Sequence, residues 1–259
     1  MEQKMKLGLQ LYTLRNFTKT PEDFLSTMEK VAKIGYRYVQ VSGVGPDVNA
    51  AVIRKAKENT GLEVVITHTP FDKIQNETEK VIEDHASFGC KIIGLGMAPH
   101  EYVDSADGYR RFADVIAPAV EKIKAAGMVF SYHNHYHEFA KKNGKHFVEY
   151  FIENTDREAV KLTADVYWLH YAGLDECAWL SEHKDRISCT HFKDMGVHEQ
   201  KQCMIEVMEG NLPYPKILAT CRDAGLLYHF VELDETRIDP FEAIEISYRN
   251  LKNTGFFEK

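Results

Sequence analysis

The sequence has few cysteines, and none are arranged to build a disulfide framework or a thiolate metal site. The number is odd and there is no C-x-x-C pair: the cysteines are Cys90, Cys177, Cys189, Cys203 and Cys221. Small secreted scaffolds and structural zinc sites both need closely and regularly spaced cysteines, so both classes are excluded. A reducing compartment is expected.

The sequence also lacks long apolar runs and an excess of positive charge. Nowhere do about eighteen apolar residues follow one another, and the first residues, Met-Glu-Gln-Lys-Met-Lys, contain no apolar signal region. The net charge of −7 repels phosphate backbones and anionic lipids. We therefore expect a cytoplasmic protein that binds neither nucleic acid nor membrane.

What is present is a repeated alternation of short β-rich runs and helical stretches. A glycine stands between helix and strand at Gly35, Gly61, Gly89, Gly127 and Gly225, where a helix C′ residue with φ > 0 is wanted. The eight predicted strands are Leu7–Leu11, Tyr36–Val41, Leu62–Thr67, Lys91–Leu95, Met128–Tyr132, Val160–Ala164, Ile187–Phe192 and Leu226–Leu233. The eight predicted helices are Pro21–Ile34, Asn49–Thr60, Glu77–Phe88, Tyr109–Ala126, Phe147–Asn154, Cys177–His183, Pro215–Ala224 and Pro240–Asn253.

Eight β/α units over residues 1–259 predict an α/β fold, a single (β/α)8 TIM barrel domain. The competing doubly wound sheet is disfavoured because no G-x-G-x-x-G follows the first strand. Pro118 is expected to kink or split the fourth helix. The stretch 195–214 has no strong pattern and is a candidate lid or substrate loop.

Polar residues follow every predicted strand, at the end of a barrel where catalytic groups are found. In chain order this ring contains Gln10, Tyr12, Arg15, Gln40, Ser42, His68, Met97, Pro99, His100, residues 133–138, Asp165, Trp168, His170, His191, Lys193, Asp194, Glu232, Asp234 and Glu235. Asp165, His191 and Glu232 offer carboxylate and imidazole ligands without a thiolate, which suits a catalytic Mn²⁺, Co²⁺, Mg²⁺ or Zn²⁺ rather than a structural zinc. Taken singly, each of these three residues could instead be a helix cap or a turn residue.

The segment Tyr132–Phe139, Tyr-His-Asn-His-Tyr-His-Glu-Phe, adds a fourth corner to this site. His133 follows the strand most directly. Glu138 supplies the hard anionic oxygen that Mn²⁺ or Mg²⁺ prefers, although it must fold back from the loop, and we favour it slightly as the metal ligand. His135 would then face the substrate, while His137 is equally explained as a solvated loop residue.

The remaining ring residues are candidates for binding substrate: Gln10, Tyr12, Arg15, Gln40, His68 and Trp168. His68 is equally well explained as a buried core histidine, and Trp168 could stack on a sugar or merely cover the barrel mouth. Arg15 and Lys193 could hold an anionic group or polarise a carbonyl, but ion pairs with Asp194 or Glu235 would also explain them.

The chain resembles the xylose isomerase-like TIM barrels, a family of sugar and sugar-phosphate isomerases and epimerases that includes inosose dehydratase and endonuclease IV. The resemblance rests on Leu7–Arg15, Tyr132–Phe139, Asp165–Trp168, His191–Asp194 and Val231–Glu232. It implies a divalent metal, usually manganese, held by Glu, Asp, His and Glu from the fifth to eighth strands. The last three fall on Asp165, His191 and Glu232. The first position is held by His133, with Glu138 as a replacement, and Gln40 stands where many relatives have Glu.

The resemblance implies a metal-dependent isomerase or epimerase of a sugar, keto sugar or sugar phosphate that acts through an enediolate by proton transfer. Glu232 is the first candidate for the base, and His135 or His133 for the second transfer, with Lys193 beside them. One alternative is a lyase or dehydratase of the inosose or keto-glycoside type; another is a non-catalytic sugar-binding barrel. An endonuclease role is disfavoured by the acidic charge. The expected partner is a small carbohydrate, and a homo-oligomer is compatible with the sequence.

Overall fold

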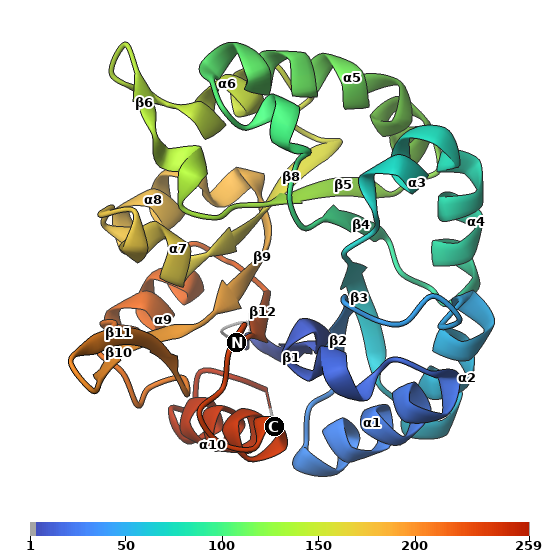
Figure 1. Ribbon diagram of the computed structural model, residues 1–259, viewed down its shortest axis with the longest axis vertical. Coiled ribbons are helices and arrows are strands. Elements are labelled where there is room, and N and C mark those ends of the chain that lie inside the picture. Colours follow the sequence, from blue (N-terminus) through green and yellow to red (C-terminus); the bar gives the residue numbers. More distant parts are fainter. Residues whose placement is uncertain (1–3, 259) are drawn as a thin grey trace.

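Eight parallel strands form a closed barrel in the computed structural model, which describes residues 4–258. Around the barrel the order is β1-β12-β9-β8-β5-β4-β3-β2 (Figure 1). The bounds are β1 (Lys6–Gln10), β2 (Tyr38–Val41), β3 (Glu63–Thr67), β4 (Ile92–Leu95), β5 (Val129–His133), β8 (Val160–Asp165), β9 (Ile187–Phe192) and β12 (Tyr228–Val231). This confirms the predicted TIM barrel and all eight predicted strands.

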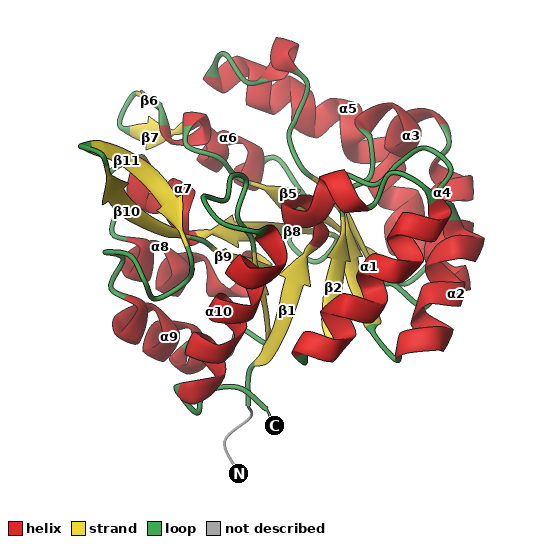
Figure 2. Cartoon of the chain, turned by 60° about the horizontal axis from the view of Figure 1, so that its bottom comes forward, coloured by secondary structure: helices red, strands yellow, loops and turns green. Residues whose placement is uncertain are grey.

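Helices surround the barrel, and Figure 2 shows them outside the strands. Those predicted from the sequence are α1 (Pro21–Ile34), α2 (Ala50–Thr60), α4 (Thr78–Ser87), α5 (Ala106–Ala125), α6 (Phe147–Glu153), α8 (Glu176–His183), α9 (Tyr214–Asp223) and α10 (Pro240–Asn253). The start of α1 could be predicted because it has a local capping signal. Thr20 accepts a hydrogen bond from the Asp23 N–H, and Pro21 occupies the first turn. Gly35 ends this helix with φ +117°.

Some elements lie outside the sequence-based assignment. Two short helices, α3 (Phe71–Asn76) and α7 (Val166–Tyr171), and four short 3₁₀ segments, Leu11–Phe17, His100–Tyr102, His137–Phe139 and Lys184–Arg186, were not predicted. Two hairpins were also missed: β6 (Lys141–Lys142) with β7 (Lys145–His146), and β10 (Asp194–His198) with β11 (Lys201–Ile205). The alternative of a split fourth helix is wrong. Pro118 lies within an unbroken α5 on its exposed side, where a carbonyl that loses its partner can reach water.

The barrel interior is filled below the strand ends. Tyr38, Ile66, Cys189 and Phe230 form a buried apolar cluster there. Gly8 is required beside it, because a Cβ at this position would lie 2.5 Å from the Phe230 ring. Since this layer closes the barrel, polar groups can meet a ligand only at the carboxyl ends of the strands. Within residues 4–258, no helix combines the length and apolar character needed to cross a membrane.

Candidate metal and substrate site

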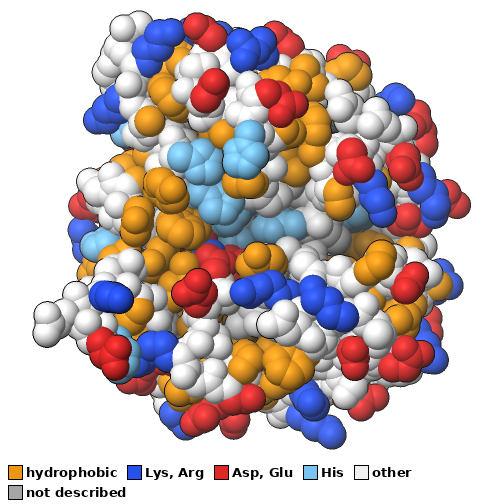
Figure 3. Space-filling model, viewed as in Figure 1, with side chains coloured by type: hydrophobic (Ala, Val, Ile, Leu, Met, Phe, Trp, Pro, Cys, Tyr) orange, Lys and Arg blue, Asp and Glu red, His pale blue; other side chains and the backbone are white. Residues whose placement is uncertain are grey.

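A cavity of about 630 Å³ opens at the carboxyl ends of the strands. Figure 3 looks onto this face and shows a central hollow with histidines in its wall and acidic side chains at its floor. The wall contains eleven residues of the sequence-predicted ring, namely Tyr12, Arg15, Ser42, His68, Met97, His133, His135, Trp168, Glu232, Asp234 and Glu235. The other lining residues are Thr69, Pro70, Phe71 from α3, Leu95 and Gly96.

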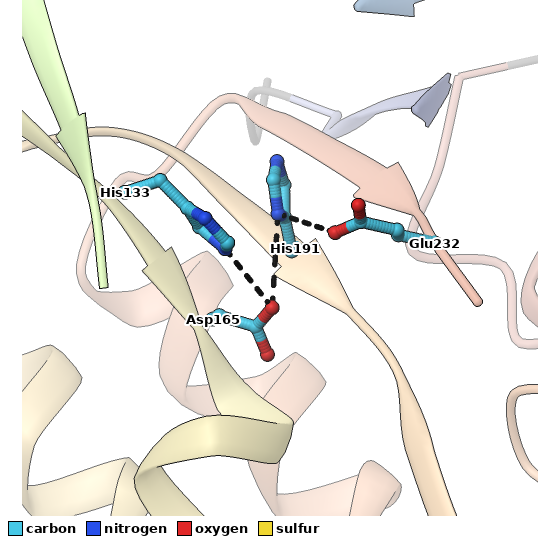
Figure 4. Close-up of side chains that lie close together, drawn as sticks. All are labelled: His133, Asp165, His191 and Glu232. Carbon is cyan, nitrogen blue, oxygen red and sulfur yellow. Dashed lines mark hydrogen bonds and ion pairs between the residues drawn. The ribbon is translucent and has the colours of Figure 1, made fainter. Parts of the chain in front are cut away.

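Four buried side chains from four neighbouring strand ends converge at the floor of the cavity (Figure 4). They are His133 at the end of β5, Asp165 at the end of β8, His191 in β9, and Glu232 directly after β12. One potential ligand atom from each lies within 4.8 Å of all the others. Asp165 Oδ2 is 3.2 Å from His133 Nε2, and Glu232 Oε2 is 2.8 Å from His191 Nδ1.

Hydrogen bonds behind the two histidines decide which ring nitrogens face this point. His133 donates from Nδ1 to the Gly96 carbonyl oxygen at 3.1 Å, and His191 donates from Nε2 to Gln40 Oε1 at 2.6 Å. Both acceptors are oxygens, so the opposite nitrogens, His133 Nε2 and His191 Nδ1, are left with lone pairs in the neutral rings. An imidazole oriented by an acceptor behind it is the usual arrangement of a metal-binding histidine.

The convergence leaves lone pairs facing one another. His191 Nδ1 is buried without a hydrogen-bond partner and lies 2.8 Å from Glu232 Oε2, an oxygen that has the Lys193 ammonium 3.0 Å away. A nitrogen lone pair and a carboxylate oxygen repel at that distance unless a cation lies between them. Against the opposing effect of burial, Glu232 raises the pKa of His191, because a proton on Nδ1 would relieve this repulsion. Two imidazoles and two carboxylates therefore fit a divalent metal ion chemically.

Lys193 brings a positive charge into the same cluster. Its Nζ lies 3.1 Å from Asp165 Oδ2, 3.0 Å from Glu232 Oε2 and 3.0 Å from Asp234 Oδ2. Burial opposes ionisation of both acids, but the Lys193 ammonium outweighs it and holds the pKa of Asp165 and of Glu232 below the usual range. These carboxylates are therefore ionised at neutral pH.

Asp165 performs two tasks with its two oxygens. Oδ1 accepts hydrogen bonds from the Tyr167 and Trp168 N–H groups and so caps α7, while Oδ2 faces the cluster. Its own N–H is held by Asn134 Oδ1 at 3.0 Å. Asp165 is therefore a helix N-cap, as one alternative from the sequence had it, and it is also part of the buried cluster. The capping hydrogen bonds fix the orientation of its carboxylate in that cluster.

Glu138, the residue slightly favoured from the sequence as the first ligand, does not join this cluster. Its buried carboxylate accepts hydrogen bonds from the Tyr132 hydroxyl at 2.7 Å and the His135 N–H at 2.9 Å. His137 Nε2 is 3.3 Å away, so Glu138 belongs to a separate group with His135 and His137. Burial raises the pKa of Glu138 to about 7. The 3₁₀ turn His137–Phe139 turns this side chain toward Tyr132 and away from the strand ends.

Two glutamines from the predicted substrate set stand behind the histidines. Gln10 and Gln40 are fully buried and do not line the cavity. Gln40 holds His191, as described above, and Gln10 Nε2 lies 3.3 Å from His68 Nδ1. His68 does face the cavity, and its Nε2 has no hydrogen-bond partner. Burial and the neighbouring His133 lower the pKa of His68.

The cavity wall toward α7 is aromatic. Trp168 lines the cavity, and its ring centroid lies 5.7 Å from that of His135. Burial and His133 lower the pKa of His135 to about 2, so this imidazole is neutral, and its Nδ1 has no partner. On the opposite side Arg15 stacks on Tyr12 at 4.4 Å.

Asp194, another acid in the predicted ring, has a different task. Its carboxylate accepts hydrogen bonds from the N–H groups of Met195, Met208, Gly210 and Leu212 at 2.7–3.2 Å. It therefore ties down the segment 195–214, which was expected to be a patternless loop and instead begins with the β10–β11 hairpin. A Cβ on Gly210 would lie 2.4 Å from this carboxylate, which explains the glycine.

Some site features carried no readable sequence signal. The Gly96 carbonyl that orients His133 is a backbone group, and the amide of Asn134 acts through the Asp165 backbone. Phe71 lies on a helix that was not predicted. Residues that end a strand can be recognised in the sequence, whereas the groups that orient them from behind follow no such pattern.

The chain is similar to known proteins in sequence and in fold. A family model described as xylose isomerase-like TIM barrel matches residues 28–231. An inosose dehydratase from Clostridium beijerinckii is 24% identical over 90% of this chain and 90% of its own length. The crystal structure of a sugar phosphate isomerase/epimerase from Parabacteroides distasonis superposes with a TM-score of 0.81 at 24% identity, covering 98% of this chain and 96% of that one. The structure of an IOLI protein with a bound zinc atom gives a TM-score of 0.74 at 14% identity, covering 98% and 100%.

Proposed function

The chain belongs to the xylose isomerase-like TIM barrel family, and from this premise we propose that it is a divalent-metal-dependent isomerase or epimerase of a sugar or keto sugar. The observation that carries the proposal is the convergence of two imidazole lone pairs and two carboxylates on one buried point at the strand ends. A cavity with polar and aromatic walls lies directly above that point.

We assign the metal ligands as His133, Asp165, His191 and Glu232, with His133 in place of Glu138. Mn²⁺ is the preferred ion because the set mixes nitrogen and anionic oxygen donors, and Mg²⁺, Co²⁺ and Zn²⁺ are the alternatives. When bound, such an ion acts as a Lewis acid toward substrate oxygens and stabilises negative charge on them by several kcal/mol. Lys193 stays beside Asp165 and Glu232 as a fixed positive charge that supports the same developing charge.

The proton transfers are assigned to residues that line the cavity. Glu232 is ionised and reaches the cavity, so its carboxylate can take a proton from a carbon next to a carbonyl, which generates an enediolate. His135 lines the same cavity as a neutral imidazole whose Nδ1 has no partner, and we assign it the proton exchange on the other face of the substrate. An epimerase needs a base on one face of the substrate and a proton donor on the other, because the proton must return from the side opposite to its removal.

Substrate orientation is assigned to the upper wall. His68 Nε2 and Trp168 Nε1 are polar groups without a partner in the described structure, and both residues line the cavity. They are suited to hydrogen-bond sugar hydroxyls, while Tyr12 and Arg15 line the cavity after the end of β1. Gln10 and Gln40 act one step back by holding His68 and His191, which makes them positioning residues.

A second candidate function is a dehydratase or lyase of the inosose or keto-glycoside type, favoured by the similarity to an inosose dehydratase. Removal of the same proton would be followed by loss of water or an aglycone from the neighbouring carbon. The two functions separate in deuterium oxide. An isomerase or epimerase exchanges a carbon-bound proton without losing a group, whereas a lyase releases one water or aglycone for each turnover.

The proposal is tested by stripping the protein of metal with a chelator and measuring deuterium incorporation into a panel of keto sugars by NMR. We expect exchange in the Mn²⁺-loaded protein, at least about 100-fold less in the stripped protein, and recovery when Mn²⁺ is returned. Asp165→Asn should behave like the stripped protein. Asp175→Asn is the matched control, because Asp175 caps α8 at an exposed position outside the site. Full exchange without metal would refute the proposal.

A further inference from the structure

We propose that the substrate is an uncharged glycoside, whose second ring stacks on an aromatic platform at the mouth of the barrel. The platform consists of Tyr136, Trp168 and Tyr171. The inference rests on the proposed function, because it takes the metal cluster as the place where the reacting ring binds. It adds the chemical class of the substrate and the place where its second ring lies.

The three platform rings contact one another and reach from the cavity to the surface. Tyr136 lies 5.6 Å from Trp168 and 5.2 Å from Tyr171 between ring centroids, and Trp168 lies 5.5 Å from Tyr171. Trp168 lines the cavity, whereas Tyr136 is 49% exposed and Tyr171 is 50% exposed. In Figure 3 an apolar area over α7 borders the histidines of the central hollow. A ligand in the cavity can therefore continue onto the platform without crossing a gap.

The platform is held rigid from below. Tyr167 packs against Trp168 at 4.9 Å and against Tyr171 at 6.2 Å, and its hydroxyl contacts the Gln202 side chain of the β10–β11 hairpin. Aromatic side chains have few rotatable bonds, and rings packed in this way lose little further freedom when a ligand binds. Exposed tyrosines that are already ordered offer flat apolar faces to the C–H face of a sugar ring.

The charges around the cavity argue against a phosphorylated substrate. Glu232, Asp234 and Glu235 line it, and Arg15 is the one cation among its described lining residues. The Arg15 guanidinium is already stacked on Tyr12 and donates to the Tyr12 carbonyl oxygen at 3.0 Å. Lys193 is surrounded by three carboxylates. Once Asp165 and Glu232 hold the metal ion, Asp234 and Glu235 are the acids left to pair with Lys193 and to line the mouth. Beyond the metal, a phosphate dianion would therefore find no free cation among the described lining residues, whereas a neutral glycoside needs none.

The size of the site fits two rings better than one. The cavity volume of about 630 Å³ lies well inside the range of roughly 300–1,000 Å³ that holds drug-sized ligands. A free hexose is smaller than such ligands and would leave the platform uncovered. A disaccharide would place one ring over the metal cluster and extend past Trp168, so that its other ring covers Tyr136 and Tyr171.

The test measures binding of neutral and charged probes to the Mn²⁺-loaded protein by calorimetry. The probes are glucose, glucose 6-phosphate and a panel of disaccharides with different linkages, namely cellobiose, gentiobiose, sucrose and trehalose. We expect at least one disaccharide to bind about tenfold more tightly than glucose, and glucose 6-phosphate to bind more weakly than glucose. The double variant Tyr136→Ala/Tyr171→Ala should reduce the ratio of disaccharide to glucose affinity about tenfold. Tyr136→Phe/Tyr171→Phe keeps both rings and should retain the ratio.

Two results would overturn the inference. One is that no disaccharide in the panel binds better than glucose, or that glucose 6-phosphate binds most tightly. The other is that the alanine double variant keeps the disaccharide preference while its thermal unfolding matches that of the wild type. Failure of the proposed function would look different: metal content or solvent proton exchange would be missing, while the disaccharide preference would persist.

Discussion

Replacing His133 and Glu138 one at a time distinguishes the two possible first ligands of the metal. His133→Asn keeps an amide N–H where the His133 Nδ1–H reaches the Gly96 carbonyl, but removes the Nε2 that faces Asp165. Glu138→Gln has nearly the same shape as the native side chain. Its amide oxygen can accept from the His135 N–H, and its amide nitrogen can donate to the Tyr132 oxygen.

The expected changes in the free energy of unfolding follow from the binding of Mn²⁺ to the folded state alone. At a free Mn²⁺ concentration of 100 Kd, binding raises the free energy of unfolding of the wild type by about 2.7 kcal/mol, which is roughly 5–10 °C in Tm. Loss of a group that merely supports a ligand costs about 10–100-fold in affinity, and loss of a ligand should cost at least the upper value. At the same Mn²⁺ concentration His133→Asn is then stabilised by only about 0.4 kcal/mol. Glu138→Gln should lose about 1 kcal/mol without metal but keep the full increment with Mn²⁺.

The assay is thermal unfolding with and without Mn²⁺, together with elemental analysis of each protein after dialysis. We expect about one Mn²⁺ per chain in the wild type and in Glu138→Gln, and much less in His133→Asn. If Glu138→Gln loses both the metal and the thermal increment while His133→Asn keeps them, the assignment of His133 as the fourth ligand is refuted.

Three further predictions concern buried charges and protons. Lys193→Met leaves three buried carboxylates without their ammonium, so we expect the free energy of unfolding of the metal-free protein, measured in urea, to fall by about 3–5 kcal/mol. Mn²⁺ should restore part of this loss, and an unchanged free energy of unfolding would contradict the prediction. Burial lowers the pKa of His229 to about 4 in the folded protein, whereas the pKa in the unfolded chain is about 6.5. Between these two pH values the unfolded chain binds a proton at His229 and the folded protein does not. This contribution is fully present above about pH 6.5 and falls by up to about 3 kcal/mol as the pH drops toward 4, so the stability of metal-free His229→Gln should depend less steeply on pH. Asp194→Asn places an amide against four backbone N–H groups and should cost at least about 2 kcal/mol, with faster proteolysis within 195–214; an unchanged cleavage rate would count against the anchoring role.

The barrel could be predicted because its signals are local. Capping at Thr20, proline at Pro21 and glycine at Gly35 mark the bounds of α1 without reference to any distant residue. Parallel strands then bring their carboxyl ends together whatever the loops do, which is why Asp165, His191 and Glu232 could be grouped from the sequence alone. The same rule found His133 and Lys193, although it could not say what they touch.

The features that could not be predicted from the sequence depend on the path of the loop that follows each strand. Both His133 and Glu138 follow β5 closely, and only the turn at His137–Phe139 sends the Glu138 carboxylate to Tyr132. Asp194 stands among the site residues in the sequence, yet the loop after β11 folds back to surround its carboxylate with N–H groups. Residue type and spacing along the chain therefore determined the barrel and the residues that end its strands. The direction of each side chain, and the partners behind it, were decided by tertiary contacts, because hydrogen bonds between distant segments leave no periodic pattern in the sequence.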